Sequence, residues 1–202
     1  MKIARRLIFA ALCLKAPAVR GATLGYTAPY RYLESGFATF EPADQFADLD
    51  MGVAGLDSMA TQRSALGVAG IQVSSRITGF SERGASFFKI TFFLNEPSAW
   101  SLTGSFELLG STGFACVSIQ DLAHQDTLIV NEVIYAPPLV AESRKLDFGG
   151  VLASGNYSLE AMIYGGGDSQ STRGGIDAVF SIPEPGAVQL LVIALLPRAR
   201  RR

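Results

Sequence analysis

The sequence predicts a mainly β protein that folds as an antiparallel, jelly-roll-like β-sandwich. Short stretches in which apolar and polar residues alternate recur at intervals of roughly 10 to 14 residues, with Gly, Pro, Asn and Asp between them. The gaps are too short for the helical crossovers that a parallel sheet needs. No internal repeat and no linker divides the central part of the chain. We therefore expect one sandwich domain over residues 19–182.

Seven segments are predicted to be strands, and the strongest of them is Phe87–Leu94. Its Phe88, Ile90, Phe92 and Leu94 share one face, because side chains two residues apart point the same way. A strand this apolar would promote aggregation if it lay at the open edge of a sheet. We therefore expect it to lie inside a sheet. The other predicted strands are Ile71–Ile77, Trp100–Leu109, Gly113–Gln120, Thr127–Tyr135, Tyr157–Tyr164 and Ala178–Ile182.

Two further segments have a less regular pattern. Ala43–Gly70 is rich in Ala, Met, Leu and Asp and shows only weak periodicity, which favours a short helix or an irregular loop. Val151–Tyr157 contains Ser, Gly and Asn in succession and is typical of a turn that leads into a strand.

The N-terminus has the three parts of a secretory signal. Cations in Lys2–Arg6 precede the apolar run Leu7–Leu14, and Ala16 and Ala18 then form an A-x-A pair. The cations stay on the cytoplasmic side while the apolar run enters the translocon, and the peptidase needs small side chains beside the cut. We expect residues 1–18 to form a cleavable signal helix, with cleavage after Ala18 or, as a second choice, after Ala22.

The C-terminus, residues 183–202, has a second set of ordered features. A Pro-Glu-Pro triplet is followed by the apolar run Gly186–Leu196 and then by a basic end. As a helix the 11-residue run would be about 16 Å long, whereas a bilayer core is about 30 Å thick. The run is therefore better suited to a sorting signal that is later removed than to a permanent membrane anchor. The triplet and the basic end consist of Pro183, Glu184, Pro185, Arg198, Arg200, Arg201 and Arg202.

This order of triplet, apolar run and arginine cluster resembles the PEP-CTERM sorting signal. The resemblance covers about the last 20 residues, and it departs from the pattern in its short apolar run, which contains Gln189 and ends at Pro197. It implies that the partner is an exosortase, a membrane-embedded cysteine transpeptidase that acts near the triplet. It also implies an exported bacterial protein at the cell surface or in an extracellular polysaccharide matrix, with only transient membrane association through the tail.

Charge narrows the range of partners once the two ends are set aside. Residues 19–182 contain nine basic and seventeen acidic residues, which gives a net charge of −8. A negative surface repels phosphates and anionic lipids, so nucleic acid and membrane surfaces are disfavoured as partners.

The residues that could support catalysis or a cofactor are few. Cys13 belongs to the leader, so Cys116 cannot form an internal disulfide, and its strand-like surroundings favour a buried, inert thiol. His124 is the single histidine and lies in a polar, loop-like stretch with no Gly-x-Ser-x-Gly motif in the chain. No catalytic residue and no cofactor is therefore assigned.

Two acidic groups remain as alternatives. A glycosidase needs two carboxylates across a cleft, and the candidates are Glu107, Asp121, Asp126 and Glu132. A weak extracellular calcium site needs several oxygen ligands in one loop, and the candidates are Asp44, Asp48, Asp50 and Asp57. The second group lacks the closing Glu of a hand-type calcium loop.

Aromatic side chains are the candidates for contact with sugars. Tyr26, Tyr30, Tyr32 and Trp100 could form stacking platforms, although aromatics in a sandwich are mostly part of its core. Two functions from different classes follow. The first is a structural or adhesive surface protein associated with polysaccharide, and the second is a secreted hydrolase with an acid pair.

Overall fold

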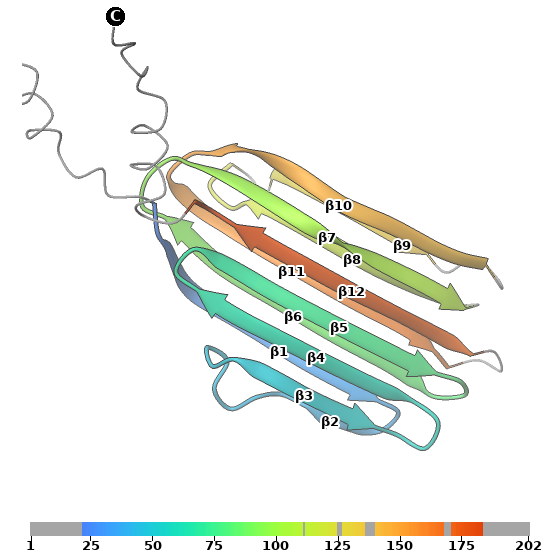
Figure 1. The fold of residues 1–202 in the computed structure, drawn as a ribbon. Coiled ribbons are helices and arrows are strands. Elements are labelled where there is room, and N and C mark those ends of the chain that lie inside the picture. Colours follow the sequence, from blue (N-terminus) through green and yellow to red (C-terminus); the bar gives the residue numbers. More distant parts are fainter. Residues whose placement is uncertain (1–21, 111, 125–126, 136–139, 168–170, 184–202) are drawn as a thin grey trace, which may run out of the picture.

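The computed structural model describes residues 22–110, 112–124, 127–135, 140–167 and 171–183. These residues form two six-stranded sheets packed face to face, and every paired strand is antiparallel (Figure 1). No helix occurs among them. The predicted β-sandwich is thus confirmed. The expected signal helix and C-terminal apolar helix lie outside the described residues, and of the sorting signal only Pro183 lies within them.

One sheet, called sheet A, has the strand order β2-β1-β6-β11-β8-β9. Its strands are β2 (Ala38–Phe40), β1 (Leu24–Ser35), β6 (Arg83–Leu94), β11 (Gly155–Gly166), β8 (Gly113–Asp121) and β9 (Thr127–Tyr135). The predicted strand Phe87–Leu94 is the C-terminal part of β6. It lies between β1 and β11, inside the sheet as expected.

The other sheet, called sheet B, has the strand order β10-β7-β12-β5-β4-β3. Its strands are β10 (Val140–Leu152), β7 (Ser98–Gly110), β12 (Thr172–Ser181), β5 (Gly70–Gly79), β4 (Met59–Gly67) and β3 (Leu49–Ala54). From β5 onward the chain changes sheet at every connection except the one from β8 to β9. This wrapping of one chain around two sheets is what makes the sandwich jelly-roll-like.

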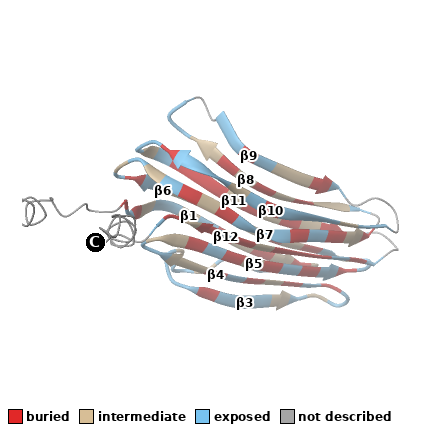
Figure 2. Cartoon of the chain, turned by 45° about the horizontal axis from the view of Figure 1, so that its top comes forward, coloured by how far each residue is buried: buried red, intermediate tan, exposed pale blue. Residues whose placement is uncertain are grey.

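The core lies between the sheets and follows the alternation read from the sequence. Phe88, Ile90, Phe92 and Leu94 are all buried, as predicted. Figure 2 shows buried and exposed positions alternating along most strands. Phe92 packs against Phe180 of the opposite sheet, with ring centroids 5.0 Å apart, and against Tyr157 at 5.7 Å. The contact between Phe92 and Phe180 thus joins the two layers within a core that is otherwise mostly aliphatic.

The prediction of a helix or loop over Ala43–Gly70 is wrong, because β3 and β4 occupy most of that segment. The inward-facing residues of β4 are Ala60, Gln62 and Ser64, all buried. Gln62 Nε2 donates to Ser86 Oγ of the opposite sheet at 2.9 Å. Since polar groups replace apolar ones on this inner face, the alternation exists in space but is invisible to a hydrophobicity pattern.

Outside that segment, three strands were not predicted: β1, the short β2 and β10. β1 has a register shift between Tyr26 and Ala28, and it buries Arg31 and Ser35 on its inner face. β10 is an edge strand and most of its residues are exposed. A bulge, inward polar residues and an exposed edge each remove the period-two signal.

Both ends of the described chain lie at one end of the sandwich. The amide of Leu24 donates to the Val68 carbonyl at 3.1 Å, and the amide of Ile182 donates to the Ala69 carbonyl at 2.9 Å. Val68 and Ala69 form the turn between β4 and β5. A segment attached after Pro183 therefore starts beside this turn.

We find no helix within the described ranges that has the length and apolar character to cross a membrane.

Candidate functional site

The outer faces of the two sheets differ in chemistry. The outer face of sheet B carries ion pairs and hydroxyls: Arg76 Nη2 bonds Asp177 Oδ2 at 2.6 Å, Arg63 pairs with Asp50, and the hydroxyls of Ser101 and Ser181 lie 2.8 Å apart. On this face charged and hydroxyl groups bond one another. The outer face of sheet A is instead rich in aromatic rings.

The aromatic face of sheet A is defined here by the residues around one shallow depression of about 330 Å³. Strand register brings them together from four strands. In one row across the sheet, Phe87 of β6 pairs with Tyr32 of β1 on one side and with Met162 of β11 on the other. Two residues further along β11, Tyr164 pairs with Phe114 of β8. The six large side chains that line the depression are Tyr30, Tyr32, Phe87, Phe114, Met162 and Tyr164.

The rings of the aromatic face contact one another. Tyr30 and Phe87 meet edge to face at 5.4 Å with a 63° angle between their planes. Phe114 lies 5.9 Å from Tyr164 and 6.4 Å from Tyr135. These separations lie within the range of favourable aromatic pairs, so the rings hold one another in place before any ligand arrives.

Polar groups stand around and between the rings. The Tyr32 hydroxyl donates to Glu34 Oε2 at 3.0 Å, and Lys89 Nζ lies 3.5 Å from Glu160 Oε2 in the neighbouring row. The guanidinium of Arg83 sits 5.8 Å from the centre of the Tyr164 ring. The face therefore offers apolar ring surfaces next to hydrogen-bonding groups that carry positive and negative charge.

The structure divides the four predicted sugar-contacting aromatics into two pairs. Tyr30 and Tyr32 lie on the aromatic face. Tyr26 points inward, donates to the Gly67 and Gly70 carbonyls, and burial raises its pKa to about 12. Trp100 is also buried, stacked at 6.0 Å on Phe180. The register shift after Tyr26 explains why Tyr26 and Tyr30, an even number of residues apart, lie on opposite sides of the sheet.

Phe87, Phe114, Met162 and Tyr164 were missed by the sequence reading. The signal was present, because each takes an outward position of a predicted strand where a polar residue is the usual choice. These four positions lie on three strands, and that they form one surface depends on the strand order, which the sequence pattern does not contain.

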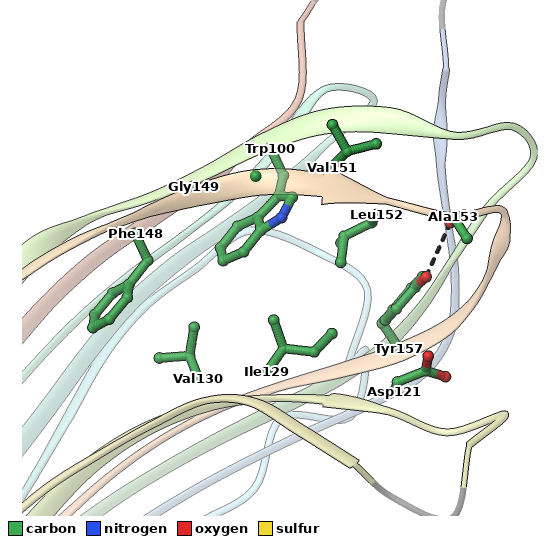
Figure 3. A pocket seen from close by; sticks show the side chains of 11 residues that line it. Trp100, Asp121, Ile129, Val130, Phe148, Gly149, Val151, Leu152, Ala153 and Tyr157 are labelled. Carbon is green, nitrogen blue, oxygen red and sulfur yellow. Dashed lines mark hydrogen bonds between the residues drawn. The ribbon is translucent and has the colours of Figure 1, made fainter.

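A second hollow, the edge cleft, lies where the two sheets end at β9 and β10 (Figure 3). Its volume is about 450 Å³. The side chains labelled in Figure 3 surround it: Trp100 and Phe148 come from sheet B, and Ile129, Val130 and Tyr157 from sheet A. The Tyr157 hydroxyl donates to the Ala153 carbonyl at 3.0 Å, and its pKa is raised by burial and by Asp121.

Asp121 is the charged residue among those that line the edge cleft. Its Oδ1 accepts the amide of Ala123 at 2.9 Å, and its Oδ2 lies 2.7 Å from His124 Nδ1. The bond with His124 is the main reason why the pKa of Asp121 is lowered. His124 itself is in the exposed turn after β8, as expected.

The candidates described by the structure do not form the acid pair of the alternative hydrolase hypothesis. Glu107 lies on sheet B, and Glu132 is engaged by Arg144 Nη1 at 3.1 Å. Glu132 pairs with Val117, four residues along β8 from Asp121, which is about 14 Å at the usual strand rise. That exceeds the spacing of roughly 5 to 9.5 Å that glycosidase carboxylates need. Asp126 lies outside the described residues.

The candidate calcium ligands make separate contacts. Asp44 accepts the amide of Phe46 at 2.9 Å, Asp50 pairs with Arg63, and Asp57 accepts the amides of Ser81 and Glu82. Within the part of the chain that the structure describes, no three acidic, His or Cys side chains gather as a metal site.

Cys116 lies in β8 as predicted, but it is half-buried on the outer side of sheet A, next to Met162, rather than buried as expected. Burial raises the pKa of its thiol to about 11, with Glu160 adding to the effect. A thiol so rarely ionised is a poor nucleophile, which agrees with the inert role expected for it.

Comparison with known proteins gives only distant likenesses. No family model and no curated protein matches the sequence. Among solved structures, the enzymatically active domain of bacteriophage CBA120 tailspike protein 4 is similar at 12% identity and a TM-score of 0.30, over 63% of this chain and 20% of that one. The chain thus spans a fifth of the length of that relative.

Two other solved structures are similar at the same level. Infectious bursal disease virus, Gx strain, aligns at 11% identity and a TM-score of 0.26, over 83% of this chain and 57% of that one. A family 29 carbohydrate-binding module in complex with cellulohexaose aligns at 11% identity and a TM-score of 0.21, over 80% and 93%. Likenesses this distant say nothing about what this chain binds.

Proposed function

We propose that this chain is an exported cell-surface or extracellular-matrix protein with a structural or adhesive role, and that its sandwich binds polysaccharide through the aromatic face of sheet A. We further propose that an exosortase-type membrane transpeptidase sorts it by means of residues 183–202. The C-terminal order of triplet, apolar run and arginines supports the sorting proposal.

One observation supports the binding proposal above the others, namely the contrast between the two outer faces. The solvent-facing side of a soluble domain is normally polar, as the outer face of sheet B is. A contiguous apolar patch on such a surface indicates a site of interaction. Here the patch spans four neighbouring strands and includes two pairs of packed rings, Tyr30 with Phe87 and Phe114 with Tyr164. A broad, shallow, preformed surface suits an extended ligand that lies across it.

The chemistry of the face favours sugar over a purely apolar partner. A sugar ring has an apolar C–H face that can lie on an aromatic ring and a rim of hydroxyls that need hydrogen bonds. The phenol groups of Tyr30, Tyr32 and Tyr164 bring polar tips to apolar rings, and the Lys89–Glu160 pair supplies a donor and an acceptor beside them. An extended polysaccharide uses both kinds of contact at once.

The placement of the chain ends is compatible with this role. Leu24 and Ile182 both bond the β4–β5 turn, at one end of the sandwich. The aromatic face lies on the flank of sheet A rather than at that end. Attachment through the C-terminus would therefore leave the face open to a surrounding matrix.

The test is affinity electrophoresis of the purified protein through gels that contain neutral polysaccharides. We expect retardation that Phe87→Ala and Tyr164→Ala each weaken about tenfold in affinity, since a stacked ring contributes about 1.4 kcal/mol. Val179→Ala, an exposed apolar position on the outer face of sheet B, is the matched control and should leave the mobility unchanged. Equal effects of all three variants, or no retardation of the parent protein, would refute the proposal.

A further inference from the structure

The edge cleft differs from the aromatic face in shape and charge. It is a wedge between the unpaired edges of β9 and β10, so its walls come from both sheets (Figure 3). Its volume of about 450 Å³ lies in the range of small-molecule sites. A hollow of this size holds one or two sugar rings, not a chain that passes across it.

The floor of the cleft is apolar and aromatic. Trp100 and Phe148 face Ile129 and Val130 across it, and Tyr157 closes the side nearest Asp121 (Figure 3). Beside the indole, β10 has Gly150, where an added Cβ would come within 3.3 Å of Trp100 Nε1. Glycine at this position lets β10 lie close against the indole, and Trp100 remains 8% exposed at the wall of the cleft.

One negatively charged residue, Asp121, lines the cleft beside Tyr157 (Figure 3). The Ala123 amide and His124 hold the Asp121 carboxylate in place, and the resulting low pKa keeps it ionised at neutral pH. An ionised carboxylate only accepts hydrogen bonds. Of the described residues that line the cleft, none is a lysine or an arginine. A ligand carboxylate would therefore face the negative Asp121, whose basic contact is His124.

From these observations we propose that the edge cleft is a second glycan site, separate from the aromatic face, that takes the end or a side branch of a chain. It selects a sugar ring that presents hydrogen-bond donors, either hydroxyls or an ammonium group, to Asp121 and rejects uronic acids. The ligand class rests on the proposed function, whereas the site and its charge preference rest on the cleft residues alone.

The protein contains one tryptophan, Trp100, so its intrinsic fluorescence reports on this cleft directly. The probes are methyl β-glucoside, glucosamine and glucuronate, which share one ring and differ in charge. We expect saturable fluorescence changes with the first two and at least tenfold weaker binding of glucuronate. Comparison of the first two probes distinguishes hydroxyl from ammonium recognition. No response to any probe, or equal binding of glucuronate, would overturn the proposal.

Two variants separate the charge effect from a loss of folding. Asp121→Asn should abolish the discrimination against glucuronate, and Ile129→Arg, at a half-exposed position in the cleft wall, should reverse it. A reversed preference cannot come from unfolding. His124→Ala leaves the carboxylate and should keep the order of the three probes. If Asp121→Asn and Ile129→Arg both keep the preference against glucuronate, Asp121 is not the cause of that preference.

The two sites can fail independently. Phe87→Ala on the aromatic face should leave the fluorescence titrations unchanged. Retardation in polysaccharide gels without any tryptophan response would leave the proposed function standing and remove the edge cleft as a site.

Discussion

Asp57 and Glu82 each cap the turn that contains the other. Asp57 accepts the amides of Ser81 and Glu82, both at 3.1 Å, in the turn between β5 and β6. Glu82 Oε2 accepts the Leu56 amide at 2.8 Å and the Ser58 hydroxyl at 3.2 Å in the turn between β3 and β4. A turn within sheet B is thereby tied to the turn that links sheet B to sheet A, at the end opposite the termini of the described chain.

This exchange predicts acid sensitivity. The bond with Ser81 is the main reason why the pKa of Asp57 is lowered, and a carboxyl with a depressed native pKa stabilises the fold above its unfolded pKa. That contribution is lost as the pH falls below about 4 and through the native pKa. Asp57→Asn should therefore lower the urea midpoint at pH 7, and its difference from the parent should shrink towards pH 3. A difference that stays constant with pH would contradict the role of the charge.

The core row of β6 predicts a contrast between neighbouring positions. Phe92 is fully buried between Tyr157 and Phe180, so Phe92→Ala should cost about 3 to 5 kcal/mol. Lys89→Ala removes a partly exposed ion pair with Glu160 and should cost less than about 1 kcal/mol. Urea unfolding of both variants measures the contrast. Similar small losses would mean that β6 does not face the core in this register.

We expect that replacing the buried Arg31 by an apolar residue of similar size changes the free energy of unfolding little. Its side chain is fully buried beside Phe88 and bonds the Ala47 carbonyl, but its Nε and Nη2 have no partner among the described residues. Burial lowers the pKa of its guanidinium, a sign that the charge is held at a cost. Arg31→Met should leave the unfolding free energy equal or higher. Arg31→Ala, which opens a cavity, should be less stable than Arg31→Met, and a large loss in both would show that the charge itself is needed.

If the C-terminal tail is a sorting signal, two changes to it should block processing of the protein. Replacement of Glu184, or deletion of Arg198–Arg202, should leave an unprocessed precursor, because the resemblance places recognition in the triplet and the basic end. Mass spectrometry of the surface fraction from an exosortase-bearing host is the measurement. Surface protein that still ends at Arg202 would refute sorting, and recovered protein that still carries Met1–Leu14 would refute cleavage of the leader.

The sequence by itself determined the fold class, because alternation is a local property. Phe88, Ile90, Phe92 and Leu94 report their shared face wherever the strand is placed. The same rule fails where the inner face is polar, as in Gln62 and Ser64 of β4, because hydrophobicity no longer marks the buried side.

Only the tertiary structure decided which residues form a surface. Tyr32, Phe87 and Met162 are far apart in the chain and become neighbours through the pairing of β1, β6 and β11. Trp100 and Asp121 face one cleft because β9 and β10 end their sheets on the same side. Strand order arises from the packing of the whole chain, so a site built from several strands has no signature in any one of them.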